Sequence, residues 1–419
     1  YFGSWMLSHR IPAELKKDIF DSQYIWFSHG HPDHLNPDSL PRFKANKILL
    51  PDHVNGRIFK DIAPLGYDVT ILPDRRWVSL SDNIRVQCLT TVIQDAILLI
   101  DICGKLFINL NDAGTKFGAR HIKRVVGGYK HSCLLALSGY GDTDMMNFFA
   151  EDGSFVEPLA ALKLPVGREL SVAAKVLGAT SVMPFSSFHQ YQRADSIWAQ
   201  KFTTPIDAYA EGMLPELAYF TPFSSIDCRN LSVEAGAPGA LPVTIKPPEA
   251  FGDNWSDELD TADKQSIEGY FSRKERVRLG FGFLNFKVGG RDFTIRLQGP
   301  RDRGISFSAP RNSPMSSIDY RIFDDLLIGN FMKTTLHGVG TLYEEPGNFN
   351  VNVAKFGDNG LVESEKDIRR YEAIYRRRAG VDHFADLFHD KSRDFLTRFA
   401  GADSRIYKVA KAFYNSVAR

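Results

Sequence analysis

Short apolar runs alternate with amphipathic stretches over the first quarter of the chain. This alternation is typical of strands that are connected by helices. Strands are expected at 24–27, 47–50 and 68–72, and helices at 12–20, from residue 36 and from residue 53. The pattern predicts an α/β arrangement for this region.

From residue 77 the pattern changes to successive strands, with Gly104 in a tight turn between two of them. The expected strands cover 77–80, 84–91, 96–102 and 105–110, followed by a helix at 118–126, a strand at 133–137, a helix at 168–178 and a strand at 181–185. Consecutive strands joined by tight turns indicate antiparallel pairing.

The last part of the chain follows a Pro-, Gly- and Ala-rich stretch at 233–255. Beyond it we expect a hairpin at 283–288 and 291–297, a helix at 318–331, a strand at 350–353, and helices from Ser364 to Gly380, at 381–399 and at 403–418. Ser364 with Asp367 forms a capping-box pattern. We expect a metal-binding domain at 1–230, a linker or wrapping segment at 231–265, and an α+β domain at 266–419.

Composition narrows the class of protein. With 419 residues, two domains are the better expectation. No apolar run reaches the roughly 18 residues that a membrane span needs. The net charge of +1 gives no general attraction to nucleic acid. The chain begins at Tyr1 without an initiator Met, so we expect a piece of a longer protein.

The four cysteines, Cys88, Cys103, Cys133 and Cys228, form no CxxC pair and no disulfide framework. The first three lie in apolar runs, which favours free buried thiols in a reducing cytoplasm.

The sequence Ser28-His29-Gly30-His31-Pro32-Asp33-His34 follows an apolar run and holds three of the eleven histidines. Imidazole and carboxylate are ligands for zinc, iron and manganese. A strand that ends in a turn can direct such side chains to one point. The segment therefore predicts a metal site.

Two further candidate ligands also follow expected strands. Asp112 comes after the strand at 105–110, and His189 comes after the strand at 181–185. Rigid strands commonly place functional side chains on loops at one sheet edge. We therefore expect Asp112 and His189 beside the three histidines.

His29, His31, Asp33 and His34 form an HxHxDH signature, and with Asp112 and His189 the chain resembles the metallo-β-lactamase superfamily over roughly residues 1–200. The resemblance implies an αββα sandwich with a one- or two-metal site. It implies that His29 and His31 bind the first metal, that Asp33, His34 and His189 bind the second, and that Asp112 bridges both.

One ligand of that family has no counterpart. The family has a third histidine for the first metal in the segment that corresponds to 89–95, but no histidine lies between His53 and His121. Gln94, Asp95 or a water could fill the position, or the first site is weak. His121 and His131 are possible substitutes, although a surface or hydrogen-bonded role suits both better.

A second resemblance extends over the whole chain, to the metallo-β-lactamase-like part of CMP-N-acetylneuraminate hydroxylases, which are iron oxygenases. Its short matching pieces include Asp95 to Asp112, Pro184-Phe185, Pro247-Pro248-Glu249 and 325–329. A Rieske centre needs paired Cys and His motifs, and this sequence has none. An oxygenase of this kind would need an electron-transfer partner.

The hypothesis favoured by the signature is a cytoplasmic metal-dependent hydrolase with one or two divalent ions, zinc or manganese. Asp33 and His34 are its candidate catalytic residues, and the substrate would be a small polar or anionic molecule. The alternatives are a diiron oxygenase and a metal-stabilised binding protein.

Three residues beside His189 are candidate substrate ligands: Ser187, Gln192 and Arg193. Polar groups and a cation could hold an anion, but Gln192 and Arg193 could equally begin a solvated helix. Further along the chain, Asp324-Asp325 is a chemically suggestive pair, but helix capping at the surface explains it equally well. The basic stretch at 366–378 is interspersed with acidic residues and is expected to be a solvated, paired helix face.

Overall fold

The N-terminal half of the chain forms two facing sheets. The structure, a computed structural model, describes residues 2–115, 117–137, 145–185, 188–344 and 347–382. A parallel sheet has the strand order β2 (Tyr24–Trp26), β3 (Lys47–Pro51), β4 (Asp68–Leu72). A mixed sheet has the order β13 (Ala218–Tyr219), β11 (Ser181–Pro184), β9 (Ser132–Ala136), β8 (Lys105–Asn111), β7 (Ala96–Ile102), β6 (Ile84–Thr90), β5 (Trp77–Ser81).

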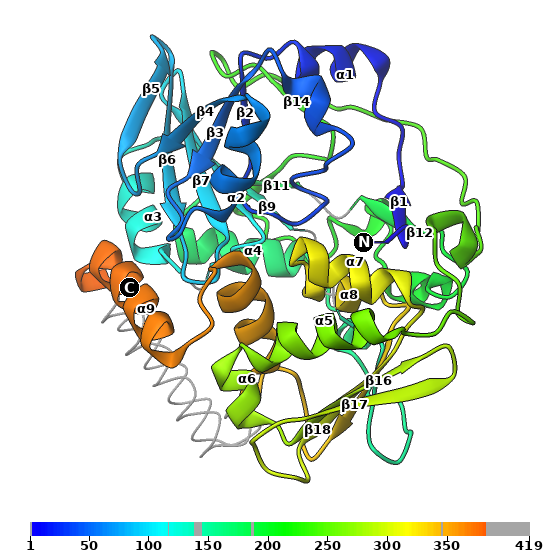
Figure 1. The fold of residues 1–419 in the computed structure, drawn as a ribbon. Coiled ribbons are helices and arrows are strands. Elements are labelled where there is room, and N and C mark those ends of the chain that lie inside the picture. The colour runs from blue at the N-terminus through cyan, green and yellow to red at the C-terminus, as the bar shows by residue number, and fades with distance from the viewer. Residues whose placement is uncertain (1, 116, 138–144, 186–187, 345–346, 383–419) are drawn as a thin grey trace, which may run out of the picture.

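Buried side chains show how these sheets are layered. Leu49 and Leu72 of the smaller sheet pack with Val86 and Leu98 of the larger one. The outer face of the smaller sheet is covered by η1 (Leu40–Phe43) and α2 (Arg57–Ile62), and that of the larger sheet by α3 (Ala119–Val126) and α4 (Val166–Leu177). This gives four layers, α/β/β/α, and confirms the predicted sandwich (Figure 1).

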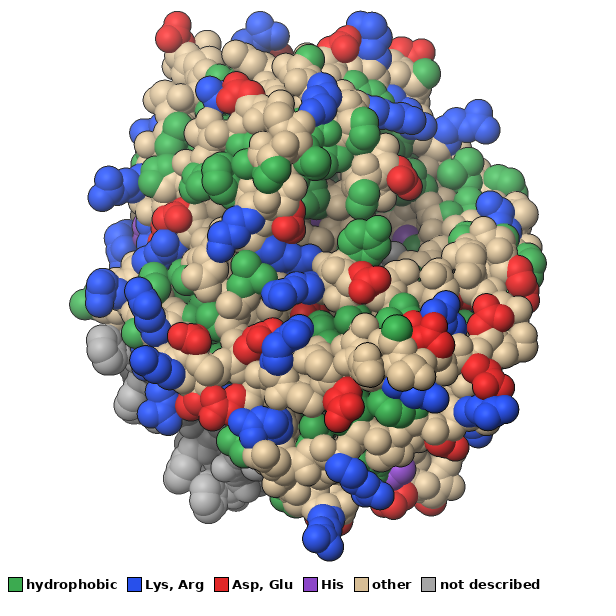
Figure 2. Space-filling model, viewed as in Figure 1, with side chains coloured by type: hydrophobic (Ala, Val, Ile, Leu, Met, Phe, Trp, Pro, Cys, Tyr) green, Lys and Arg blue, Asp and Glu red, His purple; other side chains and the backbone are tan. Residues whose placement is uncertain are grey.

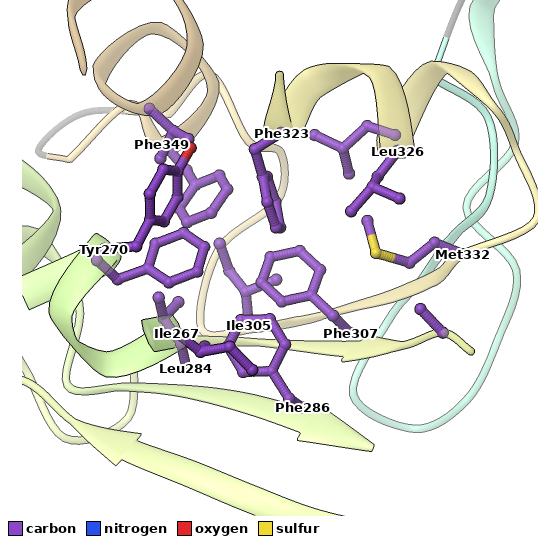
Figure 3. Close-up of a cluster of buried hydrophobic side chains, with 14 of the residues drawn as sticks. Ile267, Tyr270, Leu284, Phe286, Ile305, Phe307, Phe323, Leu326, Met332 and Phe349 are labelled. Carbon is purple, nitrogen blue, oxygen red and sulfur yellow. The ribbon is translucent and has the colours of Figure 1, made fainter. Parts of the chain in front are cut away.

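A second core lies in the C-terminal part. Its sheet has the order β10 (Phe148–Phe149), β19 (Lys333–His337), β18 (Gly304–Ser308), β16 (Phe283–Val288), β17 (Arg291–Arg296). Helices α5 (Thr261–Ser272), α6 (Glu275–Gly280), α7 (Asn312–Tyr320) and α8 (Phe323–Ile328) contribute to the same core. Figure 3 shows aromatic rings filling it, among them Phe286, Phe307 and Phe323. Because Phe323 is fully buried, the core fixes the start of α8.

Two contacts join these parts of the chain. Strand β10 comes from the N-terminal half but pairs in parallel with β19. Figure 1 shows α7 and α8 between the five-stranded sheet and the two-sheet sandwich. The domain boundaries at 230 and 265 stay a prediction.

Most of the predicted strands are present, but four expectations are wrong. The segment at 318–331 is two helices, since Arg321 between them has φ +54°. The strand expected at 350–353 is part of a π-helix, η7 (Val351–Asn359). The helix expected from residue 36 is only the 3₁₀ turn η1. Cys103 is exposed, because it lies in the β7–β8 turn with φ +51°.

The remaining elements lie at the edges of the fold. They are β1 (Trp5–Leu7) paired with β12 (His189–Tyr191), α1 (Ala13–Phe20), the pair β14 (Ser225–Ile226) and β15 (Val233–Glu234), and α9 (Glu365–Ala379). Ser364 caps α9 by accepting from the Asp367 amide, as predicted. The helices expected at 403–418 and over most of 381–399 lie outside the described residues.

The face of the molecule that Figure 2 displays is of mixed charge. Figure 2 shows Lys and Arg side chains interspersed with Asp and Glu on this face, as the small net charge suggests. Pairs on α9 such as Arg376 with Glu372 confirm its solvated, paired face. Over the part of the chain that the structure describes, no helix has the length and apolar character needed to cross a bilayer.

Arg57 connects α2 to the C-terminal part. Its guanidinium donates to the carbonyls of Tyr320 and Arg321, at 2.6 and 2.8 Å, and to Oδ1 of Asn359 at 3.0 Å. We expect Arg57→Ala to lower the free energy of unfolding by about 1.5–3 kcal/mol, the usual contribution of hydrogen bonds to a charged group. Urea unfolding measures this, with Lys60→Ala on the exposed side of α2 as the control. An equal effect of both variants would contradict the assignment.

Lys274 is a buried cation beneath η7. Its Nζ lies 3.6 Å from the Asp358 carboxylate and 3.3 Å from the centre of the Tyr270 ring. Burial lowers the pKa of Lys274 to about 8, although Asp358 opposes the shift. Between about pH 8 and 10.5 the unfolded chain therefore binds more protons at this position, and stability rises with pH there.

Between pH 7.5 and pH 10.5 we expect the free energy of unfolding of the wild type to rise by about 3 kcal/mol relative to that of Lys274→Met. A shift of one pKa unit corresponds to 1.36 kcal/mol. Urea unfolding of both proteins at the two pH values measures the change. The difference between the proteins removes the contributions of other titrating groups. A difference that does not depend on pH would rule out a depressed pKa at Lys274.

Candidate metal centre

The histidine motif forms the loop that follows β2. The Phe27 amide still donates to the Leu49 carbonyl of β3, so the loop starts at a fixed position on the sheet. The amides of His34 and Leu35 donate to the His31 carbonyl at 3.0 and 2.8 Å. This turn folds His34 back over His29, with ring centroids 4.2 Å apart.

His29, His34 and Asp112 converge on one point. Their ligand atoms all lie within 4.8 Å of one another. Nε2 of His29 is 3.4 Å and Nε2 of His34 is 3.2 Å from the same Asp112 oxygen. The His29 side chain is 1% exposed, whereas those of His34 and Asp112 are 18% and 26% exposed. This group, the open group, is thus reachable from solvent on one side.

Asp112 owes its position to a local irregularity in β8. The β8–β9 register shifts between Asn109 and Asn111, and Asn111 has φ +52°, a conformation that Asn tolerates better than most residues. Oδ1 of Asn109 accepts from the Asn111 amide at 3.0 Å. A bulge of this kind redirects the next side chain, here Asp112 toward the histidines.

Charge coupling within the open group is strong. Burial would raise the pKa of Asp112, but hydrogen bonds from His29 and His34 hold it well below its usual range. Burial would lower the pKa of His34, but Asp112 and Asp33 raise it to about 10. Burial alone would raise the pKa of Asp33, and the His34 contact lowers it to about 2. Two carboxylates therefore face His34 in ionised form.

His31 lies between the open group and α8, with its Nδ1 2.9 Å from Nε2 of His29. Its Nε2 donates to Oδ2 of Asp324 at 2.9 Å, and ligand atoms of His31, Asp324 and Asp325 all lie within 4.8 Å of one another. We call these three residues the closed group, since their exposed fractions are 5%, 2% and 0%. Asp324 and Asp325 are thus buried, and the expected surface cap at this helix start is wrong.

The closed group perturbs the pKa of its members. Burial lowers the pKa of His31, but the Asp324 carboxylate outweighs this effect of burial and raises the pKa of His31 to about 9. Burial raises the pKa of Asp325 to about 7, helped by its neighbour Asp324 and opposed by His31.

Lys355 is a functional candidate that the sequence did not reveal. It lies on η7, with Nζ 3.8 Å from Asp95 and 4.0 Å from Asp324. Burial would lower the pKa of Lys355, but these carboxylates keep it above its usual value. π-Helical turns are frequent at functional sites, yet 350–353 resembles a strand in sequence, so only the fold reveals this cation.

The segment at 89–95 supplies no ligand atom to either group. Gln94 turns toward α9, where its Nε2 donates to the Tyr371 hydroxyl at 2.8 Å. Asp95 lies 3.8 Å from Nδ1 of His29, the nitrogen that faces away from Asp112. Asp95 is therefore placed to orient His29. His121 pairs with Gln87 instead, and neither it nor His131 belongs to a ligand group.

None of the other predicted residues that the structure describes belongs to either group. His189 stacks on Trp5 at 3.9 Å and belongs to neither group, so its ligand role stays a prediction. Gln192 donates to the Trp5 carbonyl. Arg193 is fully buried and donates to Asp195 and Asp253, so the alternative expectation of a solvated helix start at Arg193 is wrong. Ser187 lies outside the described residues.

The burial of Arg193 bears on its predicted substrate contact. Its guanidinium also donates to the Phe2 carbonyl and lies over the Phe331 ring. A substrate anion would have to displace a carboxylate from this interior position.

Figure 2 shows a hollow on the displayed face with a histidine side chain inside it.

Comparisons with known proteins give distant similarity only. No family model matches the chain, and no curated protein matches it. The metallo-beta-lactamase fold protein YhfI from Bacillus subtilis is similar over 42% of this chain and 71% of its own, with 13% identity and a TM-score of 0.27. A diphosphatase of the PhnP family is similar over 55% of this chain and 76% of its own, also with 13% identity and a TM-score of 0.27. The four-layer architecture therefore rests on the packing of this chain, and the assignment of the centre rests on its side chains.

Proposed function

We propose that the protein is a metal-dependent hydrolase that acts on a small polar or anionic substrate. The observation that carries the proposal is the convergence of His29, His34 and Asp112 at a partly exposed position. Two imidazoles and one carboxylate with a free side are typical of catalytic metal sites, which keep a position open for water or substrate.

The donor set fits a divalent ion. Both Nε2 atoms face one carboxylate oxygen, and zinc, manganese and iron all accept imidazole and carboxylate. When bound, such an ion supplies a Lewis acid and lowers the pKa of a coordinated water toward neutrality. His29, His34 and Asp112 would hold it.

Neighbouring residues suit hydrolysis. The Asp33 side chain is 35% exposed, and its carboxylate lies 3.3 Å from Nε2 of His34. It is therefore placed to accept a proton at the open side of the group. The Ser28 hydroxyl, 2.9 Å from Nδ1 of His29, and Asp95 orient the His29 ring. Orienting contacts of this kind typically change metal affinity or activity by 10–100-fold.

Elemental analysis of protein purified without added metal tests the proposal. We expect zinc or manganese at a stoichiometric level, together with hydrolysis of a probe such as bis(p-nitrophenyl) phosphate or p-nitrophenyl acetate. Chelation should abolish hydrolysis, and the same ion should restore it. Protein that binds no metal on titration would overturn the proposal. Bound iron with a visible absorption band and no hydrolysis would also count against it, in favour of oxygen chemistry.

A further inference from the structure

We propose that the closed group is a second divalent-metal site, in which α8 completes the centre begun by the histidine motif. His31 supplies an imidazole, and Asp324 and Asp325 supply carboxylates. The inference deepens the proposed function. It rests on that function in one respect, namely that a first ion occupies the neighbouring open group. It assigns a metal role to a helix almost 300 residues away in sequence, since Asp324 follows His31 by 293 positions.

Unpartnered oxygens are the first support. Neither carboxylate oxygen of Asp325 has a hydrogen-bond partner among the described residues, and the same holds for Oδ1 of Asp324. Both side chains are buried. Leaving a buried polar group unsatisfied costs about 1–3 kcal/mol, and more for a charged group. A bound cation is the partner that would satisfy all three oxygens together.

Charge balance is the second support. The carboxylates of Asp95, Asp324 and Asp325 are buried, and the Lys355 ammonium, on a side chain that is 14% exposed, lies 3.8 Å from Asp95 and 4.0 Å from Asp324. When His31 serves as a neutral metal ligand, the single Lys355 ammonium would leave two of these three carboxylate charges uncompensated. A divalent ion matches this charge, and buried charges in proteins are normally paired or bind metal.

The closed group also accounts for the missing histidine. In the family that the chain resembles, a ligand from the segment at 89–95 would complete the metal site to which His31 belongs. In this chain Gln94 points to α9, and Asp95 lies beside His29. His31 instead finds Asp324 at 2.9 Å. The replacement ligands thus come from the C-terminal part of the chain.

Burial predicts how the two sites differ. The closed group is buried, so water and chelator reach it less readily than they reach the partly exposed open group. The ion in the closed group would exchange slowly and fix α8 against the motif. The ion in the open group would exchange faster.

Titration of chelator-stripped wild-type protein with Mn²⁺ or Zn²⁺ tests this inference without any variant. We expect two ions per chain, one released by chelator at least about tenfold more slowly than the other. With two Mn²⁺ bound, electron paramagnetic resonance should show magnetic coupling between neighbouring ions. One ion per chain at saturation would overturn the second site while leaving the proposed function intact, and no bound ion would overturn both.

The double variant Asp324→Asn/Asp325→Asn tests whether the slowly released ion is the one bound by the closed group. It should bind one ion per chain and lose the slow phase, while Asp319→Asn, at an exposed position on α7, should still bind two. Circular dichroism monitors folding of the variant, and His31→Gln provides an independent change at the same group. Two ions retained in both His31→Gln and the double variant would contradict the assignment.

Discussion

Replacing His34 by Ala is expected to remove the ion of the open group and to lower kcat/KM for the hydrolytic probe by at least about 100-fold. His34 supplies one of the three donors that the described part of the chain brings together there, and loss of an orienting contact alone costs 10–100-fold. Elemental analysis and steady-state kinetics measure the two effects. His131→Ala serves as the matched control, because His131 belongs to neither ligand group.

The combined variant His31→Ala/His34→Ala extends this expectation. It removes a donor from the open group and a donor from the closed group, so it should retain no stoichiometric metal while its far-ultraviolet circular dichroism stays that of a folded chain. Full metal content in this variant would refute the ligand assignment. Metal loss with unchanged hydrolysis would instead refute the catalytic role of the centre.

Replacing Asp358 by Ala is expected to lower the free energy of unfolding by about 3–5 kcal/mol, the cost of removing one partner of a buried ion pair. Asp358 is 1% exposed and lies 3.6 Å from Lys274. It accepts from the Tyr270 hydroxyl at 2.6 Å and from the Phe323 amide at 3.3 Å. The variant therefore leaves a buried cation and two donors without their acceptor.

Urea unfolding of three proteins separates these contributions. Asp358→Asn keeps an acceptor for Tyr270 and Phe323 but removes the charge, so its loss should be smaller than that of Asp358→Ala. Because Phe323 begins α8, Asp358→Ala should also weaken metal binding at Asp324, which a titration with Mn²⁺ detects. A stability loss below about 1 kcal/mol would contradict the buried pair.

Local sequence determined the parts of the protein that short-range physics governs. Apolar runs marked the strands β3 and β7 because most of their side chains are buried on both faces of the sheet. The cap of α9 followed from Ser364 and Asp367, which interact within one turn. The spacing of His29, His31 and His34 predicted metal chemistry because a single loop holds all three side chains.

Tertiary structure decided what depends on distant segments. Asp324-Asp325 resembles an ordinary helix cap until the aromatic core around Phe323 draws α8 inward and buries both carboxylates. Lys355 lies on the π-helix η7, and the packing of this helix places its Nζ 3.8 Å from Asp95. The direction of His31 depends on which carboxylates approach it. That approach is set by packing between segments about 290 residues apart, and no local pattern in the sequence encodes it.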